Sequence, residues 1–199
     1  ARPRDDQAER VLLALARGCG TRAIAGIPPA RGAILRPFLG VSRETTELAC
    51  AVQGLAPWRD PHNADPSFAR VRVRERVLPV LERELGPGIA AGPAPTAELA
   101  RGDADALDGI ASQRLAELLA RTPEGASLPA TALTALPAAL RHRVIRALAR
   151  QEFGAHLGRE HALAVAALAT GWRGQGPIHV PGIEVSRTGD AILFRAPAR

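Results

Sequence analysis

The chain has 199 residues, a mass of 20.9 kDa and a formal net charge of +6. Hydrophobic residues make up 46% and charged residues 23%, which suits one domain or two small ones and excludes a wholly disordered protein. No apolar run reaches the about 20 residues that cross a bilayer, and two cysteines, Cys19 and Cys50, are too few for a disulfide scaffold. We therefore expect a cytoplasmic protein outside the membrane. All 26 basic residues are arginines, a charge that allows a polyanionic partner without requiring one.

The first predicted helix covers residues 6–17 and ends before Gly18. Asp6 and Glu9 stand three residues apart at its start, and two interpretations of this pair stay open. As a capping box, the two side chains would satisfy the first backbone amides of the helix. As a binding pair, the two carboxylates would share one helix face and hold a cationic substrate or a metal ion. A loop follows at residues 18–20.

Local signals predict one extended segment and one helix in the next stretch. Residues 33–39 are apolar and strand-like until Pro37, which cannot donate a backbone hydrogen bond. Ser42 is typical of a helix N-cap and Gly54 of a helix end. We therefore expect a helix over about residues 43–53.

An acidic loop then leads into a segment rich in arginine. Residues 58–66 contain two prolines and the pattern Asp60-x-x-Asn63-x-Asp65, which is typical of turns. One interpretation is a ligand site in which the loop orients a polar group and the arginines bind phosphates. The other is a turn-rich loop followed by a solvated helix face. The arginines concerned are Arg70, Arg72, Arg74 and Arg76.

The same segment has the apolar spacing of a helix, with an interruption. Pro79 lies inside the apolar run, so we expect a kink or a helix restart there. Glycines and prolines in residues 87–95 predict a linker between domains. The apolar residues recur four positions apart, at Val73, Val77, Leu81 and Leu85.

The second half of the chain is predicted to be helical with β-structure at its end. We expect helices over about residues 96–121, from the first-turn proline Pro137 to Gly154, and over residues 159–170. Alternating apolar residues between 178 and 194, with a turn at 188–190, predict a hairpin or a three-stranded meander.

Arginines also line one face of the predicted helix that ends at Gly154. Arg143, Arg146 and Arg150 share this face, opposite the apolar stripe. The face is either the solvated side of an amphipathic helix or a surface that contacts an RNA backbone.

Several of these segments match one family in order and spacing. They are Asp-Asp-Gln-Ala-Glu at 5–9, Leu-Ala-Arg-Gly-x-Gly at 15–20, Ile-Ala-Gly at 24–26, Arg-Pro-Phe-Leu at 36–39, Asp-x-x-Asn-x-Asp at 60–65, Arg-x-x-x-Arg at 70–74 and, more weakly, Trp-x-Gly-Gln-Gly-Pro at 172–177. The ordered set resembles the tRNA(Ile)-lysidine synthetases, which are N-type ATP pyrophosphatases of the PP-loop superfamily. The resemblance covers nearly the whole chain.

The resemblance implies a ligase that modifies tRNA. Members use ATP and magnesium to adenylate the carbon-2 oxo group of the wobble cytidine in a CAU anticodon, and the amine of free lysine then displaces AMP. The partners implied are tRNA and free lysine, with no membrane, and a homodimer is compatible with the sequence. The Ser-Gly-Gly-x-Asp-Ser phosphate loop of the family is absent from the 199 residues. We therefore expect sequence upstream of Ala1 to complete the ATP site.

The resemblance also assigns residues to the site. It places Asp6 and Glu9 in the catalytic pocket, where acidic groups can hold the lysine amine or a metal ion. The substrate-binding residues that it implies are Asp60, Asn63, Asp65, Arg70 and Arg74. The residues that it implies on the ATP side are Gly18, Gly20 and Arg36.

The expected fold is mixed and mainly α-helical. We expect residues 1–86 to be the C-terminal part of an α/β ATP-pyrophosphatase-like domain, residues 87–95 a linker, and residues 96–199 a helical, tRNA-binding domain that ends in short strands. The alternative to a ligase is a non-catalytic RNA-binding or interaction module derived from the same family. An upstream phosphate loop would distinguish the two.

Overall fold

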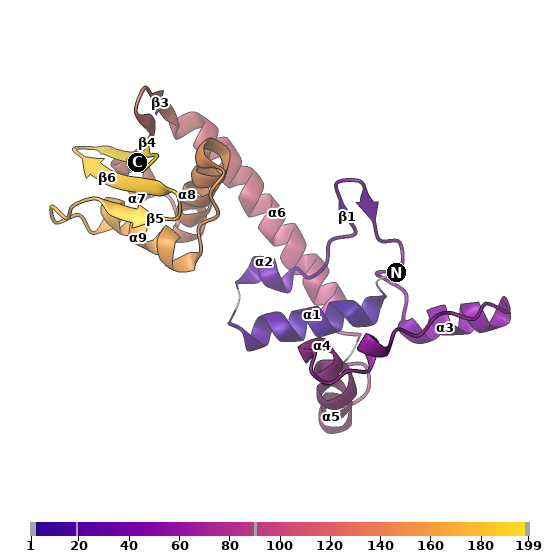
Figure 1. Ribbon diagram of the computed structural model, residues 1–199. Helices are drawn as coiled ribbons and strands as arrows, with labels where there is room; N and C mark the ends of the chain where they lie inside the picture. The colour runs from indigo at the N-terminus through magenta and orange to yellow at the C-terminus, as the bar shows by residue number, and fades with distance from the viewer. Residues whose placement is uncertain (1–2, 19, 90, 198–199) are drawn as a thin grey trace. The chain divides into compact units, whose positions relative to one another are not determined.

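The computed structural model describes residues 3–18, 20–89 and 91–197, so Cys19 lies outside the described residues. Two compact units, Ala1–Ala104 and Asp105–Arg199, divide the chain inside the long helix α6 (Pro93–Leu118). Figure 1 follows the elements in chain order. A mainly helical chain with a small antiparallel sheet at its C-terminal end is the fold class that the sequence predicted.

The first unit is built from short helices around α1. A small apolar cluster of Ala8, Val73 and Leu78 holds α1 against the segments that follow residue 68. Because this core is small, polar contacts fix much of the arrangement. The elements before α6 are α1 (Arg4–Ala16), α2 (Thr21–Ile24), β1 (Ala30–Arg31), β2 (Ile34–Leu35), α3 (Arg43–Val52), η1 (Pro61–Asn63), α4 (Ala69–Arg72), η2 (Val73–Val77) and α5 (Leu78–Leu85).

Helix α1 forms where predicted, but the predicted capping box is wrong. The N-cap is Pro3, whose side chain makes no capping hydrogen bond, and Asp6 lies inside the first turn. The side chains of Asp6 and Glu9 reach Arg43 and Arg74 instead of the helix amides. Strong cationic partners from elsewhere in the chain therefore outcompete the local backbone for these carboxylates.

Helix α3 confirms its predicted start. Ser42 is the N-cap, and its hydroxyl accepts a hydrogen bond from the Thr45 amide at 3.1 Å. The predicted extended segment at 33–39 is strand only at Ile34–Leu35, which pairs with Ala30–Arg31 in a two-residue hairpin. The strand stops there because Pro37 has no amide hydrogen to continue the ladder.

The predicted interruption at Pro79 is confirmed and has a specific form. The five residues of η2 are π-helical, and α5 restarts at Leu78 with Pro79 in its first turn. Pro79 has no amide hydrogen for the carbonyl four residues earlier, and the wider π-turn absorbs that gap. The backbone thus changes register between Arg72 and Leu78, within the stretch that carries the arginines.

The loop after α2 is held by side chains from two helices. The Gln7 amide makes two hydrogen bonds to the backbone of Ile27, donating to its carbonyl at 2.8 Å and accepting from its N–H at 2.7 Å. The Arg101 guanidinium donates to the carbonyls of Ala25 and Ile27. Gly26 lies between them with φ +64°, and a Cβ there would collide with Gln7 Oε1. Only glycine fits this position.

Helix α6 begins earlier than predicted. Pro93 opens it, inside the expected linker at 87–95, because proline suits the first turn of a helix. The helix stops at Leu118, short of the predicted end, because Ala120–Thr122 pairs as strand β3. Helices α8 (Ala138–Phe153) and α9 (Arg159–Thr170) end where predicted, and the left-handed Gly154 follows α8. Pro137 is the N-cap of α8 and does not lie in its first turn, where it had been predicted.

The second unit contains more β-structure than the predicted hairpin or meander. Its five antiparallel strands lie in the order β3-β4-β7-β6-β5. The C-terminal strands and the turn at 188–190 are as predicted, whereas β3, β4 and helix α7 (Ala130–Ala135) were not predicted. The strands are β3 (Ala120–Thr122), β4 (Gly125–Pro129), β5 (Ile178–Val180), β6 (Ile183–Thr188) and β7 (Ala191–Arg195).

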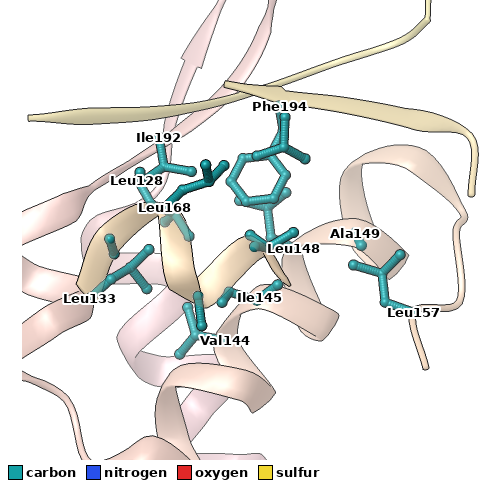
Figure 2. Close-up of a cluster of buried hydrophobic side chains, with 14 of the residues drawn as sticks. Leu128, Leu133, Val144, Ile145, Leu148, Ala149, Leu157, Leu168, Ile192 and Phe194 are labelled. Carbon is teal, nitrogen blue, oxygen red and sulfur yellow. The ribbon is translucent and has the colours of Figure 1, made fainter. Parts of the chain in front are cut away.

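Helices α7, α8 and α9 share one apolar core with this sheet. Figure 2 shows Leu128, Ile192 and Phe194 of the sheet gathered with Leu148 and Leu168 of the helices. All five side chains are at most 1% exposed. The Asp190 carboxylate at the β6–β7 turn accepts two hydrogen bonds from Thr131, which lower its pKa and tie the sheet to the start of α7.

Among the described residues, no helix combines the length and the apolar character needed to cross a bilayer. The thiol of Cys50 is free and partly buried.

The core of the second unit predicts a contrast between two leucines of α9. Leu168 is 1% exposed and Leu163 is 38% exposed. We expect Leu168→Ala to lower the free energy of unfolding by about 2–5 kcal/mol and Leu163→Ala by less than about 1 kcal/mol. Urea unfolding, followed by the fluorescence of Trp172 in a Trp58→Phe background, measures both. Equal losses would contradict the packing described here.

The Gln7 clamp predicts a contrast between two glycines. Gly26 and Gly54 both have positive φ, but a Cβ at Gly54 meets no atom within 4 Å. Both alanine variants carry about 1–2 kcal/mol of backbone strain, and only Gly26→Ala also displaces the Gln7 side chain, at a further cost of about 1–3 kcal/mol. The melting temperature should therefore fall further for Gly26→Ala. A larger fall for Gly54→Ala would refute the clamp.

Candidate active site

A buried carboxylate lies at the centre of the first unit. Glu9 is fully buried, although it is charged and sits on the first helix. Its Oε1 accepts a hydrogen bond from Arg74 Nε at 2.7 Å. Arg43 Nη2 lies 3.9 Å from the same oxygen, and Arg70 Nε lies 3.8 Å from Oε2. Three guanidinium groups thus surround one carboxylate, which is how a charge removed from water is tolerated.

The two neighbouring carboxylates of α1 connect this cluster to α3. Asp6 Oδ1 lies 3.2 Å from Arg43 Nη2, and Asp5 Oδ2 accepts a hydrogen bond at 2.7 Å from the backbone N–H of Arg43. Arg43 is the first residue of α3, so the Asp5 carboxylate satisfies one of the free amides at that helix start. We call Asp5, Asp6, Glu9, Arg43, Arg70 and Arg74 the charge cluster.

The contacts of Arg74 raise the pKa of its guanidinium group. Burial by itself would lower the pKa of Arg74, but the Glu9 hydrogen bond and the charges of Glu9, Asp6 and Glu75 raise that pKa above its ordinary value. Within the described part of the chain, Glu9 Oε2 accepts no hydrogen bond and Arg43 Nε has no acceptor. The cluster is therefore held tightly on its Arg74 side and has unused hydrogen-bonding capacity on its Arg43 and Arg70 side.

The acidic loop satisfies its own side chains. Asp60 accepts hydrogen bonds from the backbone N–H and ring nitrogen of His62, and the backbone bond is the main cause of its lowered pKa. Asp65 accepts from the backbone N–H of Ser67, which lowers its pKa in the same way. These are the turns that the simpler interpretation of the loop predicted. The loop meets the charge cluster through the Asn63 carbonyl, 3.5 Å from Arg74 Nη1.

The arginine segment is neither a solvated face nor a free row of phosphate-binding groups. Arg70 and Arg74 turn inward to Glu9. Arg72 Nη1 donates to the carbonyls of Pro66 and Ser67, at 2.8 and 2.7 Å. The cause is the packing of α4 and η2 beside α1, which places the segment next to a carboxylate that needs cations.

The residues expected on the ATP side, Gly18, Gly20 and Arg36, make contacts of their own that do not involve the charge cluster. Gly18 follows α1 with φ +62°, and Gly20 is the N-cap of the four-residue α2. Arg36 Nη1 donates to the Pro28 carbonyl at 2.9 Å. Among the described residues, no hydrogen bond or ion pair joins these three to the charge cluster.

Three side chains that organise this region were not predicted from the sequence. Arg43 completes the cluster, and nothing in its local pattern indicates a partner 34 residues upstream. Gln7 and Arg101 hold the loop at residues 25–28 through backbone carbonyls, a role with no sequence signature. No group of three or more His, Cys, Asp or Glu side chains within the described ranges is arranged to hold a metal ion.

The chemistry available here is the binding of a small charged ligand. The side chain of Asp6 is 13% exposed and that of Arg70 is 40% exposed, so the cluster presents charges of both signs to solvent. Glu9 sits behind them and keeps the guanidinium groups in place. Such an edge can bind a molecule that carries an ammonium group, a carboxylate or a phosphate.

Two family models match the chain in succession. A model described as a PP-loop domain matches residues 1–81, and a model described as the TilS substrate binding domain matches residues 128–193. The charge cluster lies within the first match. The second match begins within β4, ends within β7, and includes the helices and strands between them.

Curated relatives agree with both models. A tRNA(Ile)-lysidine synthase of Leifsonia xyli subsp. xyli is 52% identical over 96% of this chain and 58% of its own length. Proteins of the same name from Salinispora tropica and Thermobifida fusca are 54% and 48% identical over 90% and 96% of this chain. The chain spans 55% and 59% of those two relatives, so it corresponds to somewhat more than half of each protein. The two domains, in this order, and this identity show that the chain belongs to the tRNA(Ile)-lysidine synthase family.

Proposed function

We propose that this chain forms the lysine- and tRNA-facing part of an ATP-dependent tRNA(Ile)-lysidine synthase of the cytoplasm. The observation that carries the proposal is the identity of about half of all residues with proteins of that name, across both domains. The reaction would join the carbon-2 oxo group of the wobble cytidine to the α-phosphate of ATP with loss of pyrophosphate. The amine of lysine would then form a bond to carbon 2, and AMP would leave with the oxygen.

The charge cluster supports this proposal with complementary groups. The partly exposed carboxylate of Asp6 would bind a lysine ammonium group, and Arg70 would bind a carboxylate or a phosphate. Glu9 is too deeply buried to touch a substrate, so we assign it the role of a positioning residue that fixes Arg70 and Arg74. Asp60, Asn63 and Asp65 would lie beside the bound substrate, since their loop contacts Arg74 of the charge cluster.

ATP and magnesium fit these residues to different degrees. The backbone at Gly18 and Gly20 is open, with no atom within 4 Å of a Cβ position, so a phosphate could approach both glycines closely. Arg36 would help to hold ATP after giving up its bond to the Pro28 carbonyl. Magnesium does not fit the charge cluster, because Asp6 and Glu9 already face guanidinium groups.

The second unit would bind the tRNA. Its match to the TilS substrate binding domain supports this role, together with a surplus of arginine in the chain. We propose residues 1–86 as the ATP-pyrophosphatase-like part and residues 96–199 as the tRNA-binding part, with the expected linker at 87–95 shortened because α6 begins at Pro93. A homodimer stays a prediction, which the mass of the protein in solution tests.

The proposed role of Asp6 predicts a loss of lysine binding. In the protein expressed from its complete coding sequence, we expect Asp6→Asn to raise the KM for lysine by about 10- to 100-fold, since a charge-assisted hydrogen bond is lost. Transfer of labelled lysine to a tRNA(Ile) transcript with a CAU anticodon measures this. Glu44→Gln, an exposed acid of α3, is the matched control and should leave the KM unchanged. An unchanged KM in Asp6→Asn would remove Asp6 from the site.

The same assay separates the ligase from the non-catalytic alternative. A wild-type protein that binds tRNA but transfers no lysine, at any ATP concentration, would favour an RNA-binding module. Transfer of lysine that depends on ATP would exclude that alternative.

The positioning role of Glu9 predicts a structural cost. Glu9→Gln leaves three guanidinium groups around a neutral amide, and we expect the free energy of unfolding to fall by about 3 kcal/mol. The value is at the low end for a broken buried pair, because the arginines are partly solvated. Chemical denaturation measures the loss, and Glu44→Gln should cost less than about 0.5 kcal/mol. Equal stability of the two variants would show that Glu9 does not organise the cluster.

A further inference from the structure

The arginines of α8 differ in what they contact. The Arg141 guanidinium donates to the carbonyls of Leu133, Thr134 and Leu136, and so satisfies the end of α7. Arg143 Nε donates to Asp108 Oδ1 at 2.9 Å. These two cations are committed to the fold of the second unit, although the sequence placed Arg143 on the candidate RNA face.

Other arginines of the same region have no such partner. Arg146 and Arg150 of α8 and Arg159 at the start of α9 are exposed. None of them makes a hydrogen bond or an ion pair with any residue that the structure describes. Glu152 is also on α8, but its carboxylate already accepts hydrogen bonds from Arg121 Nε at 2.9 Å and Arg121 Nη2 at 2.8 Å. The positive charge of these three arginines is therefore uncompensated.

His142 shows that two of these charges converge. It lies one turn before Arg146 on α8 and is half-buried. Its pKa is lowered, first by burial and then by the positive charges of Arg146, Arg141 and Arg159. Helix α9 packs against α8, and the charges of Arg146 on α8 and of Arg159 at the start of α9 both act on the imidazole. Helix periodicity places Arg150 one turn beyond Arg146.

We propose that His142, Arg146 and Arg159 form a phosphate-binding site for the backbone of tRNA, which Arg150 extends along α8. This inference rests on the proposed function and identifies the surface of the second unit that meets the nucleic acid. A guanidinium group can donate two parallel hydrogen bonds to the oxygens of one phosphate. The half-buried imidazole of His142 can add a further hydrogen bond to the same phosphate. A phosphate group would supply the ion-pair partner that these arginines lack among the described residues.

An RNA backbone matches this surface better than an apolar or a neutral partner. The exposed groups are long, fully charged side chains in a row along a helix, so they can follow successive phosphates. Bringing like charges together without a counter-charge costs free energy, and a polyanion converts that cost into binding energy.

The salt dependence of tRNA binding tests the proposal. The full chain is titrated against a labelled tRNA(Ile) transcript between 50 and 300 mM salt, and binding is followed by fluorescence anisotropy. We expect Arg146→Gln/Arg159→Gln to weaken binding by about tenfold or more at low salt and to reduce the slope of log K against log salt by about 2. Circular dichroism of each variant checks that the fold is retained.

A matched double variant controls for total charge. Arg83→Gln/Arg114→Gln removes the same two charges, but Arg83 and Arg114 are already paired with Glu84 and Glu117. We expect this control to bind within about twofold of the wild-type chain. Equal weakening in both double variants would overturn the proposal, because net charge alone would then explain the binding.

The remaining outcomes separate this inference from the proposed function. Unchanged tRNA binding in Arg146→Gln/Arg159→Gln would overturn the proposed phosphate site. That result would not bear on the proposed lysine transfer. Loss of binding in that variant, in a protein that transfers no lysine, would support the site and refute the ligase. Wild-type binding to polyglutamate as tight as to tRNA would overturn RNA as the partner in favour of an acidic protein.

Discussion

The first unit depends on the burial of one carboxylate. Glu9 is removed from water, and the free energy of that step is acceptable only if cations accompany it. Those cations come from α3, α4 and η2, which lie 34 to 65 residues along the chain. The apolar cluster around α1 is small, so the ion pairs decide where these helices sit. Removing any partner would leave a charge without compensation.

The same requirement explains why site and scaffold are difficult to separate in this unit. Asp6 and Arg70 are partly exposed and available for ligands, whereas the buried Glu9 and its hydrogen bond to Arg74 hold the geometry. The π-turn of η2 adds a second constraint. It compensates for the missing amide of Pro79 and sets the register in which Arg74 reaches Glu9. A proline five residues away therefore influences where a guanidinium group lies.

The sequence was sufficient where one residue acts on its own backbone. Ser42 begins a helix, Gly154 ends one, and Pro79 interrupts another, because each constraint is local. It was insufficient for β4, whose Gly-Ala-Ser-Leu-Pro stretch has low β-propensity and is strand only because it pairs with β7 more than 60 residues later. In the candidate site, Glu9, Arg70 and Arg74 were predicted and lie together in the structure. Arg43, which completes the cluster, was not predicted.

Arginine shows why a charge pattern cannot be read as a surface. Arg74 belonged to a candidate phosphate-binding stripe but is hydrogen-bonded to the buried Glu9, and Arg143 belonged to a candidate surface but pairs with Asp108. Arg70 lies 3.8 Å from the same Glu9 carboxylate and stays partly exposed. Helix periodicity tells which side chains share a face, but it does not tell which carboxylates other segments bring to that face. The arginines left over after this pairing are the ones that can meet a polyanion. In the second unit, the partners of α8 rather than its sequence single out Arg146 for that role.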